Sequence, residues 1–242
     1  MRYFIYFSFD GTNYHGWQIQ PNGISVQEQL ETALSTLLRE KVPVVGAGRT
    51  DAGVHARKMV AHFDINQKID GKQLVYKLNR LLPRDMAVDR IEEVESIKHA
   101  RFSALSRTYR YYVTTNRDPF TRMFSWQTNY ELDFVLMNEA AAILLEYEDF
   151  AAFCKSHSDA KTTICNVMSA KWYMTSDTSW YFEITANRFL RNMVRAIVGT
   201  LIEVGRHRIT INEFRKIIES KQRTKAGESM PGNALFLYDI GY

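Results

Sequence analysis

The sequence predicts an α+β protein made of two ferredoxin-like units, and three observations lead to this fold class. First, 242 residues with 45% hydrophobic content are enough to bury a substantial core. Second, hydrophobic periodicity gives one order twice: strand, helix, strand, strand, helix, strand, which is the split βαβ order. Third, no low-complexity linker interrupts the chain, so we expect units at 1–100 and 101–242 to pack closely, with sheets side by side and a cleft between them.

In the first half, β-branched and aromatic residues at 2–9 predict a strand that ends at the turn-forming pair Asp10-Gly11. Ser25 and Glu28 form a capping-box pattern in front of an amphipathic helix. Two strands, a second helix and a third strand follow. Their expected ranges are 42–47, 58–64, 71–82 and 86–95.

The second half shows the same order without any residue-level repeat. The expected elements are strand 106–115, helix 131–146, strands 166–175 and 179–186, helix 189–203, an additional helix 210–219 and a last strand 234–240.

The net charge of +4 is mild, but the arginines cluster. Five arginines between positions 101 and 122 accompany one acid, Asp118, and five between 188 and 208 accompany Glu203. The planar guanidinium fork suits phosphates and stacks on bases, which indicates a nucleic-acid partner. On composition alone, a solvated basic face explains the clusters equally well.

The chain has no apolar run near the roughly 20 residues of a membrane-spanning helix, and its start, MRYFIYFSFD, lacks the features of a secretory signal. We therefore expect a cytoplasmic protein with no membrane partner. Two cysteines in such a chain, Cys154 and Cys165, are expected to stay reduced.

The most unusual segment is GRTDAGVHA, residues 48–56, which joins two expected strands. Phosphate-binding loops need different glycine spacing and a following helix, so the segment does not fit them. Cys154, His157 and Cys165 lack zinc-ligand spacing, and we expect neither metal nor cofactor. An aspartate in a tight loop usually caps backbone amides, as Asp10 and Asp118 are expected to do, so by itself Asp51 favours a structural role.

The same nine residues resemble the active-site signature of the tRNA pseudouridine synthase A family. Four further blocks, in the right order, extend the resemblance over the whole chain. They are FDGTNYHGWQIQPNG, the following SVQEQLETAL, FLRNMVRAIVGTLIEVG at 189–205, and PGNALFLYDIGY at the C-terminus. Two positions depart from the family pattern, Ala234, where a glycine is usual, and Arg188.

The resemblance implies that uridines at positions 38 to 40 in the anticodon arm of tRNA are isomerised to pseudouridine, without a cofactor, by a homodimer. Two other readings remain, a catalytically silent RNA-binding protein of the same fold and an unrelated basic hydrolase. Asp51 separates them, because a silent relative is expected to lose it. A hydrolase needs a water-activating dyad or metal, which the sequence does not offer.

The family pattern also implies roles for single residues. Asp51 acts on the sugar or the base, Arg195 is the cation that favours its ionised form, and Tyr109 stacks on the uracil. The other residues implied to bind substrate are Arg49, Arg107, Arg110, Arg191 and Leu235. Thr50 and His55 are expected to hold the loop by hydrogen bonds. For Tyr14, His15 and Trp17, RNA contact and packing are both open.

Overall fold

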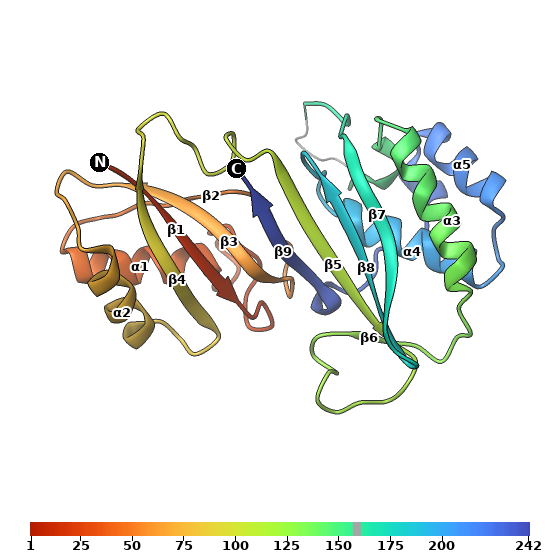
Figure 1. The fold of residues 1–242 in the computed structure, drawn as a ribbon, viewed down its shortest axis with the longest axis horizontal. Helices are drawn as coiled ribbons and strands as arrows, with labels where there is room; N and C mark the ends of the chain where they lie inside the picture. Colours follow the sequence, from red (N-terminus) through yellow and green to blue (C-terminus); the bar gives the residue numbers. More distant parts are fainter. Residues whose placement is uncertain (157–160) are drawn as a thin grey trace. The chain divides into compact units, whose positions relative to one another are not determined.

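The computed structural model describes residues 1–156 and 161–242, and the chain forms two compact units. The first unit comprises Met1–Leu105 and Phe236–Tyr242, and the second comprises Ser106–Leu235. The last strand, which we had assigned to the second unit, therefore packs with the first. Helices and sheets occur in both units (Figure 1), so the α+β class is confirmed. The ferredoxin-like description of each unit stays a prediction.

The first unit is built around strand β1 (Arg2–Phe9). It pairs antiparallel with β3 (His55–Asp64) on one side and with β4 (Met86–Val94) on the other. The two-residue strand β2 (Val45–Gly46) and the last strand, β9 (Leu235–Gly241), both pair with β3. Because β1 is central, its residues from Tyr3 to Phe7 are all buried.

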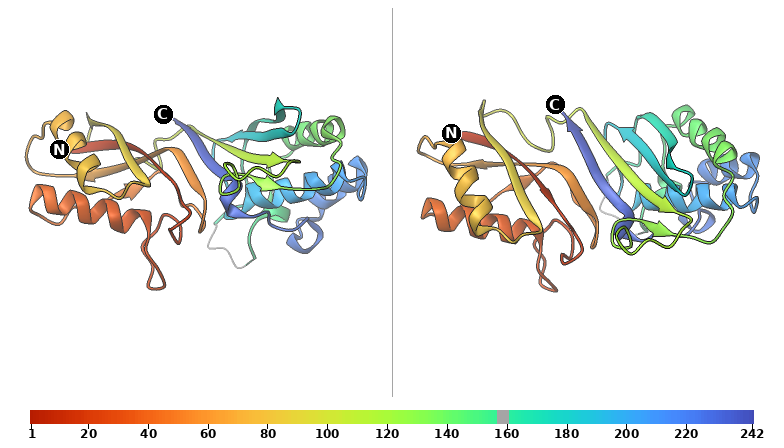
Figure 2. Two further views of the ribbon diagram at one scale, coloured as in Figure 1. Left: turned by 90° about the horizontal axis from the view of Figure 1, so that it is seen from below. Right: turned by 60° about the horizontal axis from the view of Figure 1, so that its bottom comes forward.

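Two helices complete this unit, α1 (Val26–Leu38) and α2 (Gly71–Leu81) (Figure 2). The Ser25 hydroxyl accepts a hydrogen bond from the Glu28 amide at 3.2 Å, as the capping pattern predicted. Only this half of the capping box is present at α1 among the residues that the structure describes. The complete reciprocal box occurs at Thr210 and Glu213, in front of α5 (Ile211–Ser220).

The expected strand at 42–47 is wrong for most of its length, since only Val45–Gly46 pairs with β3. The reason lies in α1. Its side chains take the amides that a strand would offer to a neighbour: Ser35 Oγ accepts from Val42 at 3.0 Å, and Glu31 Oε1 accepts from Val44 at 2.9 Å.

The second unit has β8 (Ser179–Ala186) between β5 (Ser106–Thr114) and β7 (Val167–Ser176), all antiparallel. A short strand, β6 (Trp126–Gln127), pairs with β5. Two helices, α3 (Phe134–Ile143) and α4 (Met193–Gly205), pack against each other, and α5 follows them. Four short 3₁₀ helices complete the described part of the chain: Leu144–Glu146, Ala151–Phe153, Arg223–Lys225 and Gly232–Ala234.

The arginine-bearing helix begins at Met193 and not at 189 as expected. Asn192 has a φ of 68°, a left-handed conformation that cannot lie inside a right-handed helix. The carbonyl of Arg191 instead accepts a hydrogen bond from the amide of Lys155 at 3.0 Å. Arg191 therefore lies in the turn before α4 and does not share a helical face with Arg195.

In the described part of the chain, no helix combines the length and the apolar character needed to cross a membrane. Both cysteines are free and buried, as expected. Burial raises the pKa of the Cys165 thiol to about 11, which makes it unreactive near neutral pH.

Candidate active site

Asp51 lies in the irregular segment between β2 and β3, and its side chain is partly exposed. The amide of Ala47 donates to the Val60 carbonyl at 2.8 Å where the segment leaves the sheet. A turn then brings the amide of Val54 to the Asp51 carbonyl at 3.2 Å. We call residues 47–54 the catalytic loop, because they contain Asp51, the residue that the sequence resemblance predicts to react.

A second segment, residues 10–25, holds the catalytic loop on both sides of Asp51, and we call it the first loop. The amide of Trp17 donates to the Thr50 carbonyl, and the amide of Gly53 donates to the Tyr14 carbonyl, both at 3.3 Å. The backbone just before and just after Asp51 is therefore tied to one partner segment.

Two glycines of the first loop make this approach possible. A Cβ on Gly11 would lie 2.0 Å from the Val54 carbonyl oxygen, and one on Gly16 would lie 2.3 Å from that of Thr50. Gly16 also has a φ of +88°, which favours glycine. Gly48 differs, because a Cβ there would meet no atom within 4 Å.

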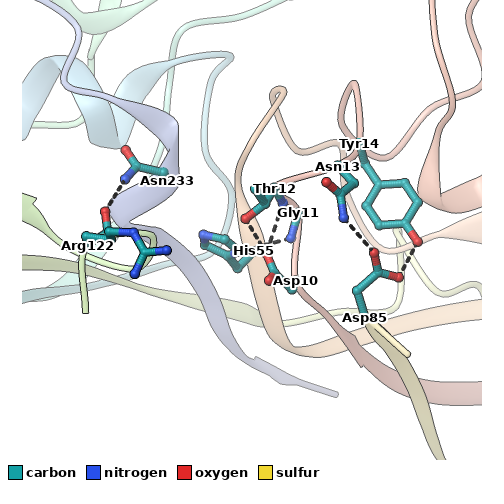
Figure 3. Close-up of polar contacts among 9 residues, drawn as sticks. All are labelled: Asp10, Gly11, Thr12, Asn13, Tyr14, His55, Asp85, Arg122 and Asn233. Carbon is teal, nitrogen blue, oxygen red and sulfur yellow. Dashed lines mark hydrogen bonds and ion pairs between the residues drawn. The ribbon is translucent and has the colours of Figure 1, made fainter. Parts of the chain in front are cut away.

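His55, the first residue of β3 after the catalytic loop, contacts the first loop, as Figure 3 shows. Its buried ring stacks on Phe236, and Nδ1 accepts a hydrogen bond from the Gly11 amide at 2.9 Å. The same nitrogen lies 3.0 Å from Asp10 Oδ1, so a protonated ring would donate to Asp10 instead. In either state His55 connects β3 to the first loop, which confirms the hydrogen-bonding role expected for it.

Asp10 caps the first loop as expected, accepting from the amide and hydroxyl of Thr12 at 2.9 and 2.6 Å. Thr50 holds the loop by a hydrogen bond as expected, but through its backbone. Its carbonyl holds the loop, whereas its Oγ1 is buried without a hydrogen-bond partner among the described residues.

Tyr14 and Trp17 pack inside the unit. The Tyr14 hydroxyl donates to Asp85 Oδ1 at 2.5 Å, and Asn13 Nδ2 donates to Oδ2 of the same carboxylate at 3.1 Å (Figure 3). Burial, together with this carboxylate, raises the pKa of Tyr14 well above its usual value. The sequence offered no sign of Asp85, because 71 positions separate it from Tyr14.

Trp17 packs its ring on Phe7, with 5.8 Å between centroids, and against Gly46, where a Cβ would collide with the indole. For Tyr14 and Trp17 the packing alternative is therefore the one that the structure supports. His15 is exposed, and so is Arg49, which lies two residues before Asp51. Both remain available to a substrate.

The second unit contains Tyr109 and Arg195. Tyr109 lies on β5, partly exposed, and meets Phe189 edge to face with 5.0 Å between ring centroids. Tyr111 shares its face of the strand, as expected, but is fully buried. Burial raises the pKa of Tyr111, and the positive charge of Arg195 partly opposes this rise, so the two side chains lie within electrostatic reach.

Arg195 occupies the first turn of α4. Its Nε donates to the Met230 carbonyl at 2.5 Å, and its own carbonyl accepts from the Met230 amide at 3.2 Å. These bonds hold the start of α4 against the segment that leads to Leu235, a buried residue at the beginning of β9.

The arginines predicted to bind substrate differ in their surroundings. Arg110 forms an ion pair with Glu183 at 2.7 Å and lies over the ring of Tyr181. Arg107 donates to the carbonyl of Asn187 at 2.8 Å, and Arg191 is exposed. A phosphate at Arg110 would have to compete with a carboxylate already in place.

Asp51 belongs to the first unit, whereas Tyr109 and Arg195 belong to the second. Their meeting around one nucleotide stays a prediction. Over residues 1–156 and 161–242, no cluster of three or more histidine, cysteine, aspartate or glutamate side chains is arranged to hold a metal. His157, considered above as a zinc ligand, lies outside the described residues.

These features define an α+β protein that presents an aspartate on a rigidly held loop and carries arginines in two sequence clusters. The sequence profile of the family described as tRNA pseudouridine synthase matches residues 5–103 and 140–242. The chain is 58% identical to tRNA pseudouridine synthase A of Bacteroides thetaiotaomicron, covering 100% of this chain and 90% of the relative. It is 39% identical to the protein of the same name from Bacillus subtilis, covering 97% of this chain and 96% of that one. The chain therefore belongs to the tRNA pseudouridine synthase family, which confirms the resemblance found in its motifs.

Proposed function

We propose that this protein isomerises uridine to pseudouridine at positions 38 to 40 in the anticodon arm of tRNA, with Asp51 as the essential carboxylate and without a cofactor. One observation carries the proposal. In a chain that family members match over 97 to 100% of its length, the backbone on both sides of the motif's aspartate is anchored to the first loop. Such anchoring fixes a reacting group in position before the substrate arrives.

The reaction detaches the uracil from its ribose, turns it and rejoins it through C5, so no atom is added or removed overall. It requires an ionised carboxylate next to the sugar or the base, as nucleophile or as proton acceptor. Asp51 fills this role under all three routes: attack on the sugar carbon, attack on the base, or removal of a sugar proton.

Two residues of the second unit complete the proposed site. Arg195 favours the ionised form of Asp51, because an opposite charge nearby stabilises a carboxylate. Tyr109 stacks on the uracil, which leaves the base free to turn because stacking does not dictate its orientation. Edge-to-face packing on Phe189 supports this role, since it holds the phenol ring while leaving part of it exposed.

Arg49, Arg107, Arg191 and Leu235 are proposed to contact the substrate around these groups. We retain Arg110 as a substrate contact on one condition. Either its bond to Glu183 opens, or other N–H groups of its guanidinium bind the substrate. The family resemblance also supports a cytoplasmic homodimer that binds one tRNA across both subunits.

The decisive experiment is tritium release from tRNA that carries 5-tritiated uridine, because C5 exchanges its hydrogen for the glycosidic bond. Asp51→Asn keeps the shape of the side chain but cannot ionise. We expect it to abolish release while tRNA affinity stays within a few-fold of wild type. Asp177→Asn, in the exposed turn between β7 and β8, is the matched control and is expected to turn over normally.

Substantial release by purified Asp51→Asn would refute the role of Asp51. A wild-type protein that binds tRNA tightly without releasing tritium would favour the silent RNA-binding alternative.

A further inference from the structure

The connection between β5 and β6, Thr115–Ser125, exposes several apolar side chains together, and we call it the Phe120 loop. Phe120 is 88% exposed, the highest value for a large hydrophobic side chain in the part of the chain that the structure describes. Met123 and Phe124 are each 38% exposed. Neighbouring apolar side chains that stay in water commonly mark an interaction surface.

The Phe120 loop is held in one conformation by its own hydrogen bonds. Asp118 Oδ1 accepts from the Phe120 amide at 2.8 Å, and Oδ2 accepts from the Thr121 hydroxyl at 2.9 Å. The Thr121 carbonyl accepts from the Phe124 amide at 2.8 Å and from the Ser125 hydroxyl at 3.0 Å. Phe120 therefore lies on a turn that is fixed by hydrogen bonds, and this order lowers the conformational entropy lost when Phe120 binds a partner.

The loop is also positively charged. Arg117 and Arg122 are exposed, and among the described residues neither forms an ion pair. The only acid of the loop, Asp118, is occupied by the backbone and by Thr121. Two other surface arginines of this unit are neutralised: Arg215 binds Glu146, and Arg208 binds Glu203.

The loop is tied to the candidate active site of the second unit. Asn233 Nδ2 donates to the Arg122 carbonyl at 3.4 Å (Figure 3). Asn233 stands two residues before Leu235 and three residues after Met230, the partner of Arg195. A nucleotide near Leu235 would thus have Phe120, Arg117 and Arg122 on a neighbouring segment.

We propose that the Phe120 loop is a tRNA-binding element of this enzyme, in which Phe120 stacks on an unpaired base and Arg117 and Arg122 bind the flanking phosphates. This inference rests on the proposed function, which makes tRNA the substrate. Exposed aromatic rings beside uncompensated cations are the combination that binds unpaired nucleic acid. Loop-to-loop contact with a second copy is disfavoured, because it would bring four like charges together.

The first test measures the affinity of a tRNA transcript bearing anticodon-arm uridines for Phe120 variants. Phe120→Ala is expected to weaken binding by about 5- to 100-fold, the usual loss for one stacked base. Phe120→Trp keeps a stacking surface and should stay within about twofold of wild type. Tyr76→Ala removes a 62%-exposed aromatic ring from α2 and serves as the control without effect.

The second test is the salt dependence of the same binding. The double variant Arg117→Gln/Arg122→Gln is expected to reduce the slope of log affinity against log salt by roughly 1.5, which is the change that the loss of two phosphate contacts produces. Arg208→Gln/Arg215→Gln removes the same formal charge from paired arginines and should change the slope far less.

Unchanged affinity of Phe120→Ala, in a protein whose wild type binds and modifies tRNA, would overturn the inference and leave the proposed function intact. Wild type that binds no tRNA would overturn both. Unchanged affinity combined with a lower sedimentation mass for Phe120→Ala would replace tRNA by a second copy of the chain as the partner.

Discussion

At Tyr109 the phenol ring meets Phe189 edge to face, and this contact leaves part of the ring exposed. We further propose that the Tyr109 hydroxyl reaches the C5 proton, and we therefore expect Tyr109→Phe to bind tRNA and to keep the stacking surface but to lose turnover. Tyr109→Leu should also lose stacking, worth about 1 to 3 kcal/mol per base. Affinity and single-turnover tritium release measure the two losses separately.

Tyr112→Phe is the control for Tyr109, since Tyr112 lies on the same strand with its side chain on the opposite face. Normal turnover by Tyr109→Phe would remove any chemical role for the hydroxyl and leave stacking alone.

Arg195 binds the Met230 carbonyl through its Nε atom, and its positive charge is proposed to favour the ionised form of Asp51. We expect Arg195→Met to reduce single-turnover tritium release by at least tenfold, because the cation that favours ionised Asp51 is lost. Arg195→Lys keeps the charge without the planar fork, so its rate of tritium release should fall between the rates of wild type and Arg195→Met. Arg208→Met, which removes a charge paired with Glu203, is the control.

Equal rates for Arg195→Lys and Arg195→Met would show that the shape of the guanidinium matters and not its charge. A wild-type rate for Arg195→Met would contradict the proposed pairing with Asp51.

At the scale of elements, the catalytic loop owes its position to the first loop. Two amide-to-carbonyl bonds and the close approach at Gly11 and Gly16 join the two segments, while His55 connects the first loop to β3. Irregular backbone of this kind is rigid only where a neighbouring segment satisfies its hydrogen bonds.

This arrangement predicts opposite outcomes for two glycine substitutions. Gly16→Ala places a Cβ 2.3 Å from the Thr50 carbonyl oxygen in a left-handed conformation, so we expect a loss of more than about 1 kcal/mol in the free energy of unfolding. Turnover should fall by about a hundredfold, because Asp51 is displaced. Gly48→Ala meets nothing within 4 Å and should leave stability within about 0.5 kcal/mol of wild type.

Urea unfolding and tritium release on the same preparations check both expectations. Wild-type turnover by Gly16→Ala would show that the contact between the first loop and the catalytic loop does not position Asp51.

At the scale of the whole molecule, stability should fall on mild acidification because of His62. This residue is buried on β3, and its Nδ1 accepts from the Ala100 amide at 3.2 Å. Burial, aided by the charge of Arg2, lowers the pKa of His62 from 6.5 to about 4. Between these values the unfolded chain binds the extra proton, so this stability is complete above about pH 6.5 and is lost as the pH falls toward 4.

Each pKa unit corresponds to about 1.4 kcal/mol, so the loss attributable to His62 is of the order of 2 to 3 kcal/mol. His99 contacts His62 and has its pKa lowered by burial too, which adds a loss of the same sign. Urea unfolding at pH 7.5 and pH 4.5 should show a smaller decrease for His62→Gln than for wild type, whereas the exposed control His207→Gln should behave like wild type. Equal decreases in all three proteins would exclude His62 as the source.

Over the whole molecule, fewer positive charges are available to bind a phosphate than the number of arginines indicates. The net charge is only +4, and many arginines already bind carboxylates, as at Arg110, Arg208 and Arg215. Arg117 and Arg122 are two exposed arginines of one loop without an ion pair among the described residues, and they stand out only when the partners of the others are known.

Local pattern was enough to predict most elements and to select Asp51 as the candidate reacting residue, a role that stays a prediction. The strand at 2–9, the helix after Ser25 and the α+β class follow from periodicity and capping, which depend on neighbours within a few positions. Asp51 was recognisable from nine consecutive residues, because the family signature is itself local. The expected caps at Asp10 and Asp118 are likewise confirmed, since each spans two or three residues.

Tertiary structure decided everything that depends on a partner far along the chain. Val42 and Val44 alternate like a strand, yet α1 takes their amides, and α4 starts late because the Arg191 carbonyl binds Lys155. Tyr14 packs inside the first unit because its hydroxyl donates a hydrogen bond to Asp85, which is distant in the sequence. Periodicity reports which side chains avoid water, but a hydrogen bond is made only by two atoms brought within about 3 Å, and that proximity is a property of the folded chain.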